Sequence, residues 1–271
     1  MNNRDSVMIE VAQLHKRFKL ADPKRGDADK HKDPRQRGRF FYSVEGVSLA
    51  CQSGQVLGLI GPNGAGKTTT LRMLSGVLTP DQGTVLIDGV DLHQNGGQAR
   101  ADIGFLSAST NLYPRFTVEE NLRYFAALYK VAPAQIEVQI DHLCQQLQME
   151  SFRHRRIDVL SSGMKQRANI ARAMVHQPKV MILDEPTTGL DIMSTEIVLQ
   201  FIREQQQRGL PVIFSSHHLD EISMLCDQLC VIDQGRALFS GALEDYCGSR
   251  DPQQLRTRFM DDHQSALQEG N

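Results

Sequence analysis

The stretch GPNGAGKTTT, Gly61 to Thr70, directly follows the apolar segment VLGLI, Val56 to Ile60. It fits the pattern G-x-x-x-x-G-K-[ST] between a strand and a helix, which is the context that this phosphate-binding motif requires. Its glycines let the backbone turn tightly and bring N–H groups against phosphate oxygens. The helix that begins near Lys67 points the positive end of its dipole at the same phosphates. The stretch therefore predicts a nucleoside triphosphate site.

The side chains of this loop have separate expected roles. The Lys67 ammonium should reach the β and γ phosphates, and the Thr68 hydroxyl should bind Mg²⁺. A glycine-rich turn with a surface lysine is the alternative, and the flanking strand and helix argue against it. The loop residues predicted to contact the nucleotide are Gly61, Pro62, Asn63, Gly64, Ala65, Gly66, Lys67, Thr68 and Thr69.

Two carboxylates follow a second apolar segment. Val180–Leu183 has the composition of a central parallel strand, and Asp184 and Glu185 come directly after it. Carboxylates at the carboxyl end of such a strand lie where ligands of α/β folds bind. We expect Asp184 to hold Mg²⁺ through water and Glu185 to act as general base on an attacking water. A pair of exposed turn acids before Pro186 is the alternative, which the phosphate loop makes weaker.

A second turn of small residues opens another helix. The stretch LSSGMKQR, Leu160 to Arg167, has this form, and helix N-termini bind anions. One triphosphate is already held by the first loop, so the second turn is predicted to serve another nucleotide. No N-K-x-D element that would specify guanine occurs in the chain, which disfavours a GTPase.

The order of patterns predicts an α/β fold. Strands alternate with helices, which implies a parallel sheet covered on both faces, and an antiparallel β portion is expected at the N-terminus. Thr117 and Glu120 form a capping box that opens a helical block. The predicted layout is a single domain over 1–240, with a core of 1–111 and 166–240, a helical subdomain over 112–165, a polar loop insert over 19–39, and a polar, weakly patterned tail over 241–271.

The charge of the insert 19–39 is uneven. It carries eight Lys and Arg residues against four Asp, with Pro and Gly as breakers. Charge runs of this kind are typical of a solvated surface loop, which is the interpretation favoured here. A contact with a partner or with an acidic membrane surface is the alternative.

Composition bounds the class of protein. The chain has 271 residues with a net charge of −2, which gives no case for nucleic acid as a partner. No apolar run reaches the ~18 residues of a membrane span, and the N-terminus lacks an apolar signal core, so a cytoplasmic protein is expected. The five cysteines are scattered and odd in number, which predicts free thiols rather than zinc ligands.

Over residues 7–240 the sequence resembles the ATP-binding subunits of ABC transporters. GPNGAGKT resembles the Walker A loop, LSSGM the signature LSGGQ, and VMILDE the Walker B strand. GLD, which ends at Asp191, resembles the D-loop, and SSHH, with His217 as its third residue, resembles the switch-histidine loop. The resemblance implies a P-loop NTPase (RecA-like) core with ATP and Mg²⁺ as ligands.

The resemblance also implies a head-to-tail homodimer with each ATP between Walker A of one copy and the signature of the other. Ser161 and the Gly163 amide would then touch the γ-phosphate held by the partner, and Asp191 would belong to the same site. His217 would contact the γ-phosphate from its own side. Phe18 matches the aromatic that stacks on adenine, with Phe41 and Tyr42 as alternatives.

Two departures from the family pattern stand out. Ala108 occupies the place of the usual glutamine after the strand that follows Walker A, and alanine cannot ligate Mg²⁺. Ser107, Ser109 or a water is left as its replacement. The signature also has Ser162 for a glycine and Met164 for a glutamine, which leaves the Ser161 and Gly163 contacts possible.

The functional prediction is the ATP-hydrolysing motor of an ABC transporter. The region around FLSAST and LYPRFTVEENLRYFAALY, with the insert, resembles the sodium-extrusion (Nat-type) and multidrug-export branch. This implies an exporter of sodium or drugs that works with a separate transmembrane permease, on the cytoplasmic face of the inner membrane. An ABC ATPase that acts on nucleic acid or ribosomes is the alternative, and a soluble P-loop kinase is contradicted by the signature.

Overall fold

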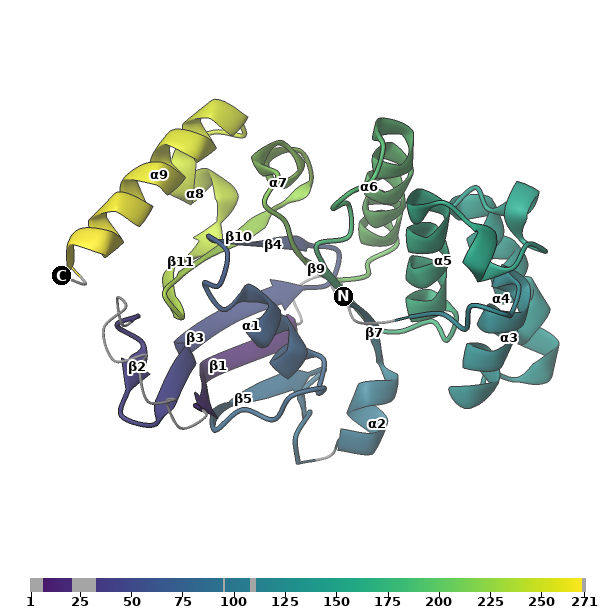
Figure 1. The fold of residues 1–271 in the computed structure, drawn as a ribbon, viewed down its shortest axis with the longest axis horizontal. Helices are drawn as coiled ribbons and strands as arrows, with labels where there is room; N and C mark the ends of the chain where they lie inside the picture. Colours follow the sequence, from purple (N-terminus) through teal and green to yellow (C-terminus); the bar gives the residue numbers. More distant parts are fainter. Residues whose placement is uncertain (1–6, 21–32, 95, 108–110, 270–271) are drawn as a thin grey trace, which may run out of the picture.

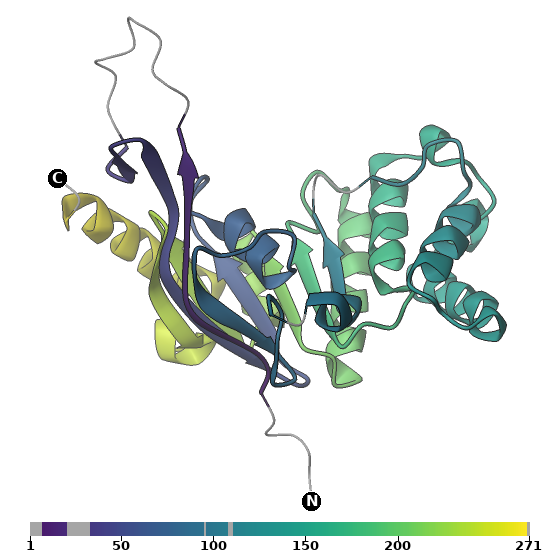
Figure 2. The same ribbon diagram turned by 90° about the horizontal axis from the view of Figure 1, so that it is seen from below.

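The computed structural model describes residues 7–20, 33–94, 96–107 and 111–269 (Figure 1). Two sheets and a set of helices make up the fold. The helical block lies at one end of the molecule and the C-terminal helix α9 lies at the other, in both views (Figure 2). Ala108, the departure from the family glutamine, and Ser109 lie outside the described residues.

The larger sheet has six strands in the order β11-β10-β4-β9-β8-β7. Its strands are β4 (Val56–Ile60), β7 (Ile103–Leu106), β8 (Val180–Asp184), β9 (Val212–Ser215), β10 (Gln228–Asp233) and β11 (Arg236–Ala242). All neighbours pair in parallel except β10 and β11. Every residue of β4, β8 and β9 is buried, because helices or the second sheet cover both faces.

The smaller sheet is antiparallel and is built mainly from the N-terminal part of the chain. Its order is β2-β3-β1-β5-β6, and its strands are β1 (Val7–Lys19), β2 (Gln36–Arg37), β3 (Phe40–Gln52), β5 (Gln82–Ile87) and β6 (Val90–Asp91). Helix α1 (Lys67–Leu74) contacts β1 and β3 of this sheet and β8 of the other. One apolar core fills the space between the two sheets. The predicted antiparallel β portion is confirmed.

The helical block contains α3 (Val118–Leu128), α4 (Pro133–Gln146), two 3₁₀ turns (Glu150–Phe152 and Ile157–Val159) and the start of α5 (Ser162–Met174). The capping box is present: the Glu120 backbone N–H donates to Thr117 Oγ1 at 3.1 Å, and the Thr117 N–H donates to the Glu120 carboxylate at 2.8 Å. Helix α5 runs past the predicted boundary at 165 and packs against β7, so it links the block to the core.

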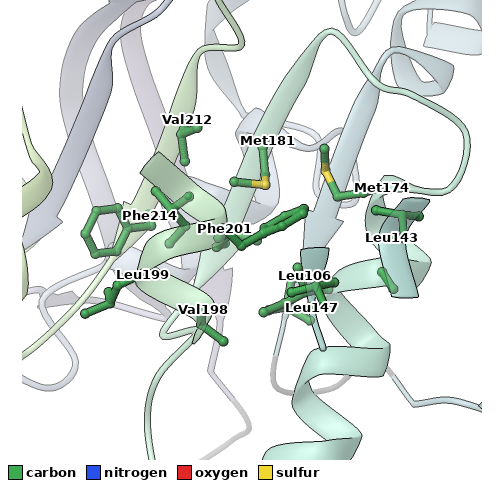
Figure 3. Close-up of a cluster of buried hydrophobic side chains, with 14 of the residues drawn as sticks. Leu106, Leu143, Leu147, Met174, Met181, Val198, Leu199, Phe201, Val212 and Phe214 are labelled. Atoms are coloured by element: carbon green, nitrogen blue, oxygen red, sulfur yellow. The ribbon is translucent and has the colours of Figure 1, made fainter. Parts of the chain in front are cut away.

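The second apolar core joins the helical block to the parallel sheet. Phe201 of α6 (Ile192–Gln207) lies close to Met181 of β8 and Leu106 of β7, with side chains of α4 and α5 nearby (Figure 3). These side chains are buried, and a shared core makes the position of the block depend on packing rather than on a flexible tether. Helix α7 (Leu219–Leu225) and α2 (Gly96–Ala101, which the sequence did not predict) complete the coverage of the sheet.

The prediction of a weakly patterned tail over 241–271 is wrong for the described residues. Ala242 ends β11, and α8 (Leu243–Cys247) and α9 (Pro252–Glu269) follow. Helix α9 packs on α7 and β10, with Leu255 fully buried and the Tyr246 hydroxyl donating to Asp262 Oδ2 at 2.7 Å. Few apolar residues anchor α9, which is why its composition resembles a solvated tail.

The predicted loop over 19–39 needs correction at its ends. Lys19 is the last residue of β1, and Gln36 and Arg37 form β2, which pairs with β3. Residues 21–32 lie outside the described residues. The insert therefore returns to the antiparallel sheet as a short edge strand rather than as a plain loop.

Candidate nucleotide-binding site

The phosphate loop connects β4 to α1. Gly66 has φ 115°, a conformation that L side chains rarely adopt, and a Cβ there would lie 2.6 Å from the Ser43 carbonyl oxygen. A Cβ on Gly61 would lie 2.0 Å from the Ile232 carbonyl oxygen. Backbone of β3 on one side and of β10 on the other therefore lies too close to the loop for a side chain at either position, so only glycine fits.

Lys67 is buried under the loop that it belongs to. Its ammonium donates to the carbonyl oxygens of Gly61 at 2.6 Å and Pro62 at 3.1 Å. Burial lowers the pKa of Lys67, and the charges of Glu185 and Asp184 oppose that shift. The Lys67 ammonium, held by two backbone carbonyl oxygens of the loop and close to two carboxylates, is placed to bind phosphate oxygens.

Asp184 and Thr68 meet between β8 and α1. The Thr68 hydroxyl donates to Asp184 Oδ1 at 3.2 Å, and the Ser215 hydroxyl donates to the same oxygen at 2.8 Å. Mg²⁺ prefers oxygen ligands and usually keeps several waters, binding through one or two carboxylates and the substrate phosphates. One buried carboxylate beside one hydroxyl at the phosphate loop fits that ion, and Thr68 and Asp184 are the residues that would hold it.

Glu185 has a constrained backbone. Its φ of 50° is unusual for a residue with a side chain, and its N–H donates to the Ser215 hydroxyl at 3.0 Å. Its carboxylate accepts from the Thr188 hydroxyl at 3.0 Å. Backbone strain of this kind persists where surrounding contacts fix it, and it is common at functional sites. Here it directs the carboxylate into the cavity above the phosphate loop.

His217 follows β9 and lies beside Glu185. Its Nδ1 atom is 3.6 Å from Glu185 Oε2, because β8 and β9 are neighbours in the sheet and Asp184 pairs with Ser215. His217 also lines a cavity of about 400 Å³ with Pro62 and with Phe259 of α9. His218, not His217, is the residue that immediately precedes α7, and its side chain makes no capping hydrogen bond.

A cavity of about 310 Å³ lies directly over the phosphate loop. It is lined by Arg35, Phe41, Ser43, Asn63, Gly64, Ala65, Gly66, Lys67, Thr68, Thr69 and Glu185. Phe18 is not among these residues: its side chain is 41% exposed on β1, directly across from Phe41 on β3. Arg35 was missed from the sequence because it lies in the charged insert, where no motif marks it.

The signature residues lie on a separate surface. Ser161 caps α5 by accepting from the Met164 N–H at 3.3 Å, and Asp191 caps α6 by accepting from the Ser194 N–H at 2.9 Å. Gly163 packs against the cap of α6, since a Cβ there would lie 2.3 Å from Ser194 Oγ and 3.4 Å from Asp191 Oδ2. Hydrogen bonds from Ser194 lower the pKa of Asp191. Neither Ser161 nor Asp191 lines the cavity over the phosphate loop of the same chain.

Residues 44–188, which carry the loop, the signature and both carboxylates, match the family model described as ABC transporter. The chain belongs to the ABC transporter family. It is an ATPase of that family, as its motifs predicted, and the predicted P-loop NTPase fold is confirmed by its structural relatives.

Three similarities illustrate this ABC ATPase assignment. The chain is 40% identical over 223 residues to the ABC transporter ATP-binding protein NatA of Bacillus subtilis (strain 168), covering 82% of this chain and 91% of that protein. It is 41% identical over 199 residues to the Nod factor export ATP-binding protein I of Paraburkholderia xenovorans (strain LB400), covering 73% of this chain and 66% of that protein. A solved structure described as the ATP binding subunit of an ABC transporter superposes with a TM-score of 0.75 at 27% identity, covering 96% and 99% of the two chains.

In the part of this ABC ATPase that the structure describes, no helix is both long enough and apolar enough to cross a membrane.

Proposed function

We propose that two copies of this ABC ATPase bind two ATP molecules head to tail and drive export through a separate transmembrane permease. The observation that carries this proposal is the separation of the two phosphate-binding elements. The Walker A loop lies under its own cavity, while the exposed Ser161 caps a different helix and lines no part of that cavity. A second copy, turned by a two-fold rotation, would bring its signature over this cavity.

Exposed apolar residues beside the signature support that contact. Ile192 is 86% exposed and Met193 is 72% exposed, and both follow the D-loop Asp191 at the start of α6. Adjacent exposed apolar side chains of this size favour burial against a partner. Gly163 of the signature packs against Asp191 and Ser194, which flank Ile192 and Met193 in the chain. The exposed side chains of Ile192 and Met193 therefore belong to the same surface as the signature.

The residues of the site suggest a division of labour in hydrolysis. Lys67 and the loop N–H groups would hold the phosphates, and Mg²⁺ on Thr68 and Asp184 would supply charge neutralisation. Glu185 would take the proton of the attacking water as general base. His217 lies 3.6 Å from the Glu185 carboxylate. It would contact the γ-phosphate of the ATP that is held by the Walker A loop of its own chain.

An aromatic surface on the helical block is the proposed contact with the permease. The side chains of Tyr113, Phe116 and Tyr124 are each more than 40% exposed. Their rings pack on one another, with centroids 5.5 Å apart for Tyr113 and Phe116 and 5.0 Å for Tyr113 and Tyr124. In the chain this aromatic surface comes after β7 and after position 108, where the family usually has a glutamine. A movement of that segment on nucleotide binding would therefore be passed to the permease through the aromatic surface.

The Tyr124→Asp variant is expected to lose the permease while it keeps ATP binding. A charge placed in the centre of an apolar contact costs about 2 kcal/mol or more, which is a loss of roughly 30-fold in association. Val138→Asp on α4 is the control, because Val138 is an exposed apolar residue outside the aromatic group, 62% exposed against 43% for Tyr124. Co-purification of a tagged chain from detergent-solubilised membranes measures the loss, and equal retention by both variants would exclude this surface.

The relatives guide the proposed direction and cargo. The named similar proteins include a Nod factor export protein and a linearmycin resistance protein of Bacillus subtilis (strain 168), the latter 33% identical over 204 residues. These names support export, and the resemblance of the sequence to the sodium-extrusion and multidrug-export branch gives the cargo that we propose, sodium ions or drugs. We propose that the chain is bound peripherally at the cytoplasmic face of the inner membrane through the permease. No nucleic acid partner is proposed.

The whole proposal is tested by purifying the tagged chain from native membranes and measuring ATP hydrolysis. We expect an integral membrane protein with several spans to accompany it in a fixed ratio and to change its ATPase rate. Recovery of ribosomal RNA or DNA in place of such a protein would favour an ABC ATPase that acts on nucleic acid.

A further inference from the structure

Helix α9 forms one wall of a second cavity beside the nucleotide site. This α9 cavity, of about 400 Å³, is bounded on one side by Arg256, Phe259 and Met260 of α9. On the other side it is bounded by the start of the Walker A loop and by the loop that carries His217. Asn63 lines both this cavity and the one over the phosphate loop, so the two cavities adjoin. The C-terminal helix therefore lies at the edge of the ATP site.

The α9 cavity has a largely apolar lining. Phe259 packs with one edge against the core beneath α9, and Met260 is 46% exposed. Pro62 and Leu219 line the same cavity. Open apolar surface of this kind is stabilised when an apolar partner covers it.

Arg256 adds an unpaired positive charge to this cavity. It is exposed, and within the described residues its guanidinium forms no ion pair and no side-chain hydrogen bond. By contrast, Arg258 on the same helix pairs with Asp262 at 3.4 Å. A free cation beside an apolar cavity is complementary to a partner that presents apolar side chains next to a carboxylate.

The start of α6 presents that combination. Its exposed apolar pair, Ile192 and Met193, is followed four and three residues later by Glu196, so the three side chains are neighbours on the helix surface. Glu196 is exposed, and in the part of the chain that the structure describes its carboxylate has no ion pair or hydrogen bond.

The two helices carry these groups with matching spacing. On α9 the charged residue precedes the apolar pair by three and four residues, and on α6 it follows the apolar pair by the same distances. Four residues of helix span about 6 Å. Two such helices that cross in opposite directions would therefore place Glu196 opposite Arg256 and the two apolar pairs opposite each other.

Within one chain these two surfaces are apart. Helix α7 packs on both α9 and α6 and lies between them (Figure 1). In the proposed head-to-tail dimer, the signature of one copy covers the phosphate loop of the other. Because Ile192 and Met193 share the surface of the signature, and the α9 cavity adjoins the phosphate loop through Asn63, the start of α6 of one copy would reach α9 of the other.

We propose that the α9 cavity receives the start of α6 of a second copy of this chain, with Arg256 paired to the partner's Glu196. The inference rests on the proposed dimer and adds the C-terminal helix to its interface. Two-fold symmetry forms the contact twice. Because His217 lines the same cavity, the contact also covers the side of the ATP site where this histidine lies.

Exchange of the two charges tests this contact in the Glu185→Gln background, in which ATP is expected to hold the dimer. Arg256→Glu and Glu196→Arg should each weaken ATP-dependent dimerisation about tenfold or more, because like charges would face each other at both contacts. A chain with both substitutions restores opposite charges, so it should dimerise within about threefold of the parent. Sedimentation velocity with Mg²⁺ and ATP, over a series of chain concentrations, measures the dissociation constants.

Two controls separate the interface from the nucleotide site. Lys130→Glu makes the same charge reversal at an exposed residue just after α3, outside both surfaces, and should dimerise as the parent does. Binding of a fluorescent ATP analogue is measured at chain concentrations too low for dimerisation. It should stay within about twofold of the parent for every variant, because neither charge lines the cavity over the phosphate loop.

Three results would overturn the inference. Unchanged dimerisation by both single variants would place α9 outside the interface. Losses that the double variant does not recover would mean that the two charges do not face each other. If the Glu185→Gln parent itself stayed monomeric with ATP, the proposed dimer would fail, and this inference would fail with it. A parent that dimerises while the α9 variants match it would leave the proposed dimer intact and contradict only the contact with α9.

Discussion

The Glu185→Gln variant is expected to bind ATP as tightly as the wild type and to hydrolyse it about 10²- to 10⁴-fold more slowly. The substitution keeps the size of the side chain and its capacity to accept from Thr188, which donates to Glu185 at 3.0 Å. It removes the basic carboxylate that would take the proton of the attacking water. In the proposed dimer each ATP lies between the two copies, so the copies should separate only when the γ-phosphate is cleaved and released. The variant should therefore also accumulate as an ATP-bound dimer.

Phosphate release and size-exclusion chromatography with Mg²⁺ and ATP measure both effects of Glu185→Gln. Glu244→Gln is the control, since Glu244 is an exposed carboxylate on α8, outside the residues that line the cavity over the phosphate loop. Hydrolysis near the wild-type rate in Glu185→Gln would exclude Glu185 as the base. If the variant hydrolyses ATP slowly but stays monomeric with ATP, the role of Glu185 as the base would be supported and the proposed dimer contradicted.

The Lys67→Ala variant is expected to lose ATP affinity by about 100-fold. A charged hydrogen bond to phosphate contributes about 1.5–3 kcal/mol, so removing the cation that spans two phosphates costs at least that much. The fold should survive, because within the described part of the chain the hydrogen bonds of the Lys67 ammonium go to carbonyl oxygens of its own loop, those of Gly61 and Pro62. Calorimetric titration with ATP checks the affinity, and circular dichroism checks the fold.

Lys179→Ala provides the comparison for Lys67→Ala. Lys179 is half exposed and pairs with Asp102 at 3.1 Å, away from the phosphate loop. The Lys179→Ala variant should bind ATP as tightly as the wild type. Retained ATP affinity in Lys67→Ala at physiological Mg²⁺ would contradict the role assigned to this lysine.

The sequence was sufficient for the parts of the site that are local. Gly61–Thr68 forms its loop because strand, glycines and helix follow one another in the chain, so the pattern contains the geometry. Asp184 ends the fully buried strand β8 and Glu185 follows it, and the same argument predicted their place. The adjacency of Glu185 and His217 was implied only by family resemblance, since the order of β8 and β9 in the sheet depends on tertiary packing.

The parts that the sequence did not predict depend on contacts between distant segments. Arg35 reaches Gly64, 29 residues away, from a segment whose charge resembles a solvated loop. Helix α9 is anchored by few buried side chains, Leu255 among them, so its apolar periodicity is weak. Phe18 and Phe41 are paired across two strands, and only folding determines that Phe41 is the one that lines the cavity.

Transfer of a label between two copies tests the head-to-tail arrangement most directly. One chain carries Lys67→Ala, which is expected to weaken its own ATP binding about 100-fold, together with Ser162→Cys in its exposed signature. The other carries Glu185→Gln and keeps Ser162. Both carry Cys247→Ser, because the other four native cysteines are buried. The probe is an ATP analogue with a thiol-reactive group on its γ-phosphate.

We predict that the thiol introduced by Ser162→Cys is labelled only when the second chain is present to hold the analogue. Labelling should disappear when the second chain also carries Lys67→Ala. A signature thiol that stays unlabelled while the second chain binds the analogue would contradict the account, because the signature of one copy would then lie far from the triphosphate held by the other.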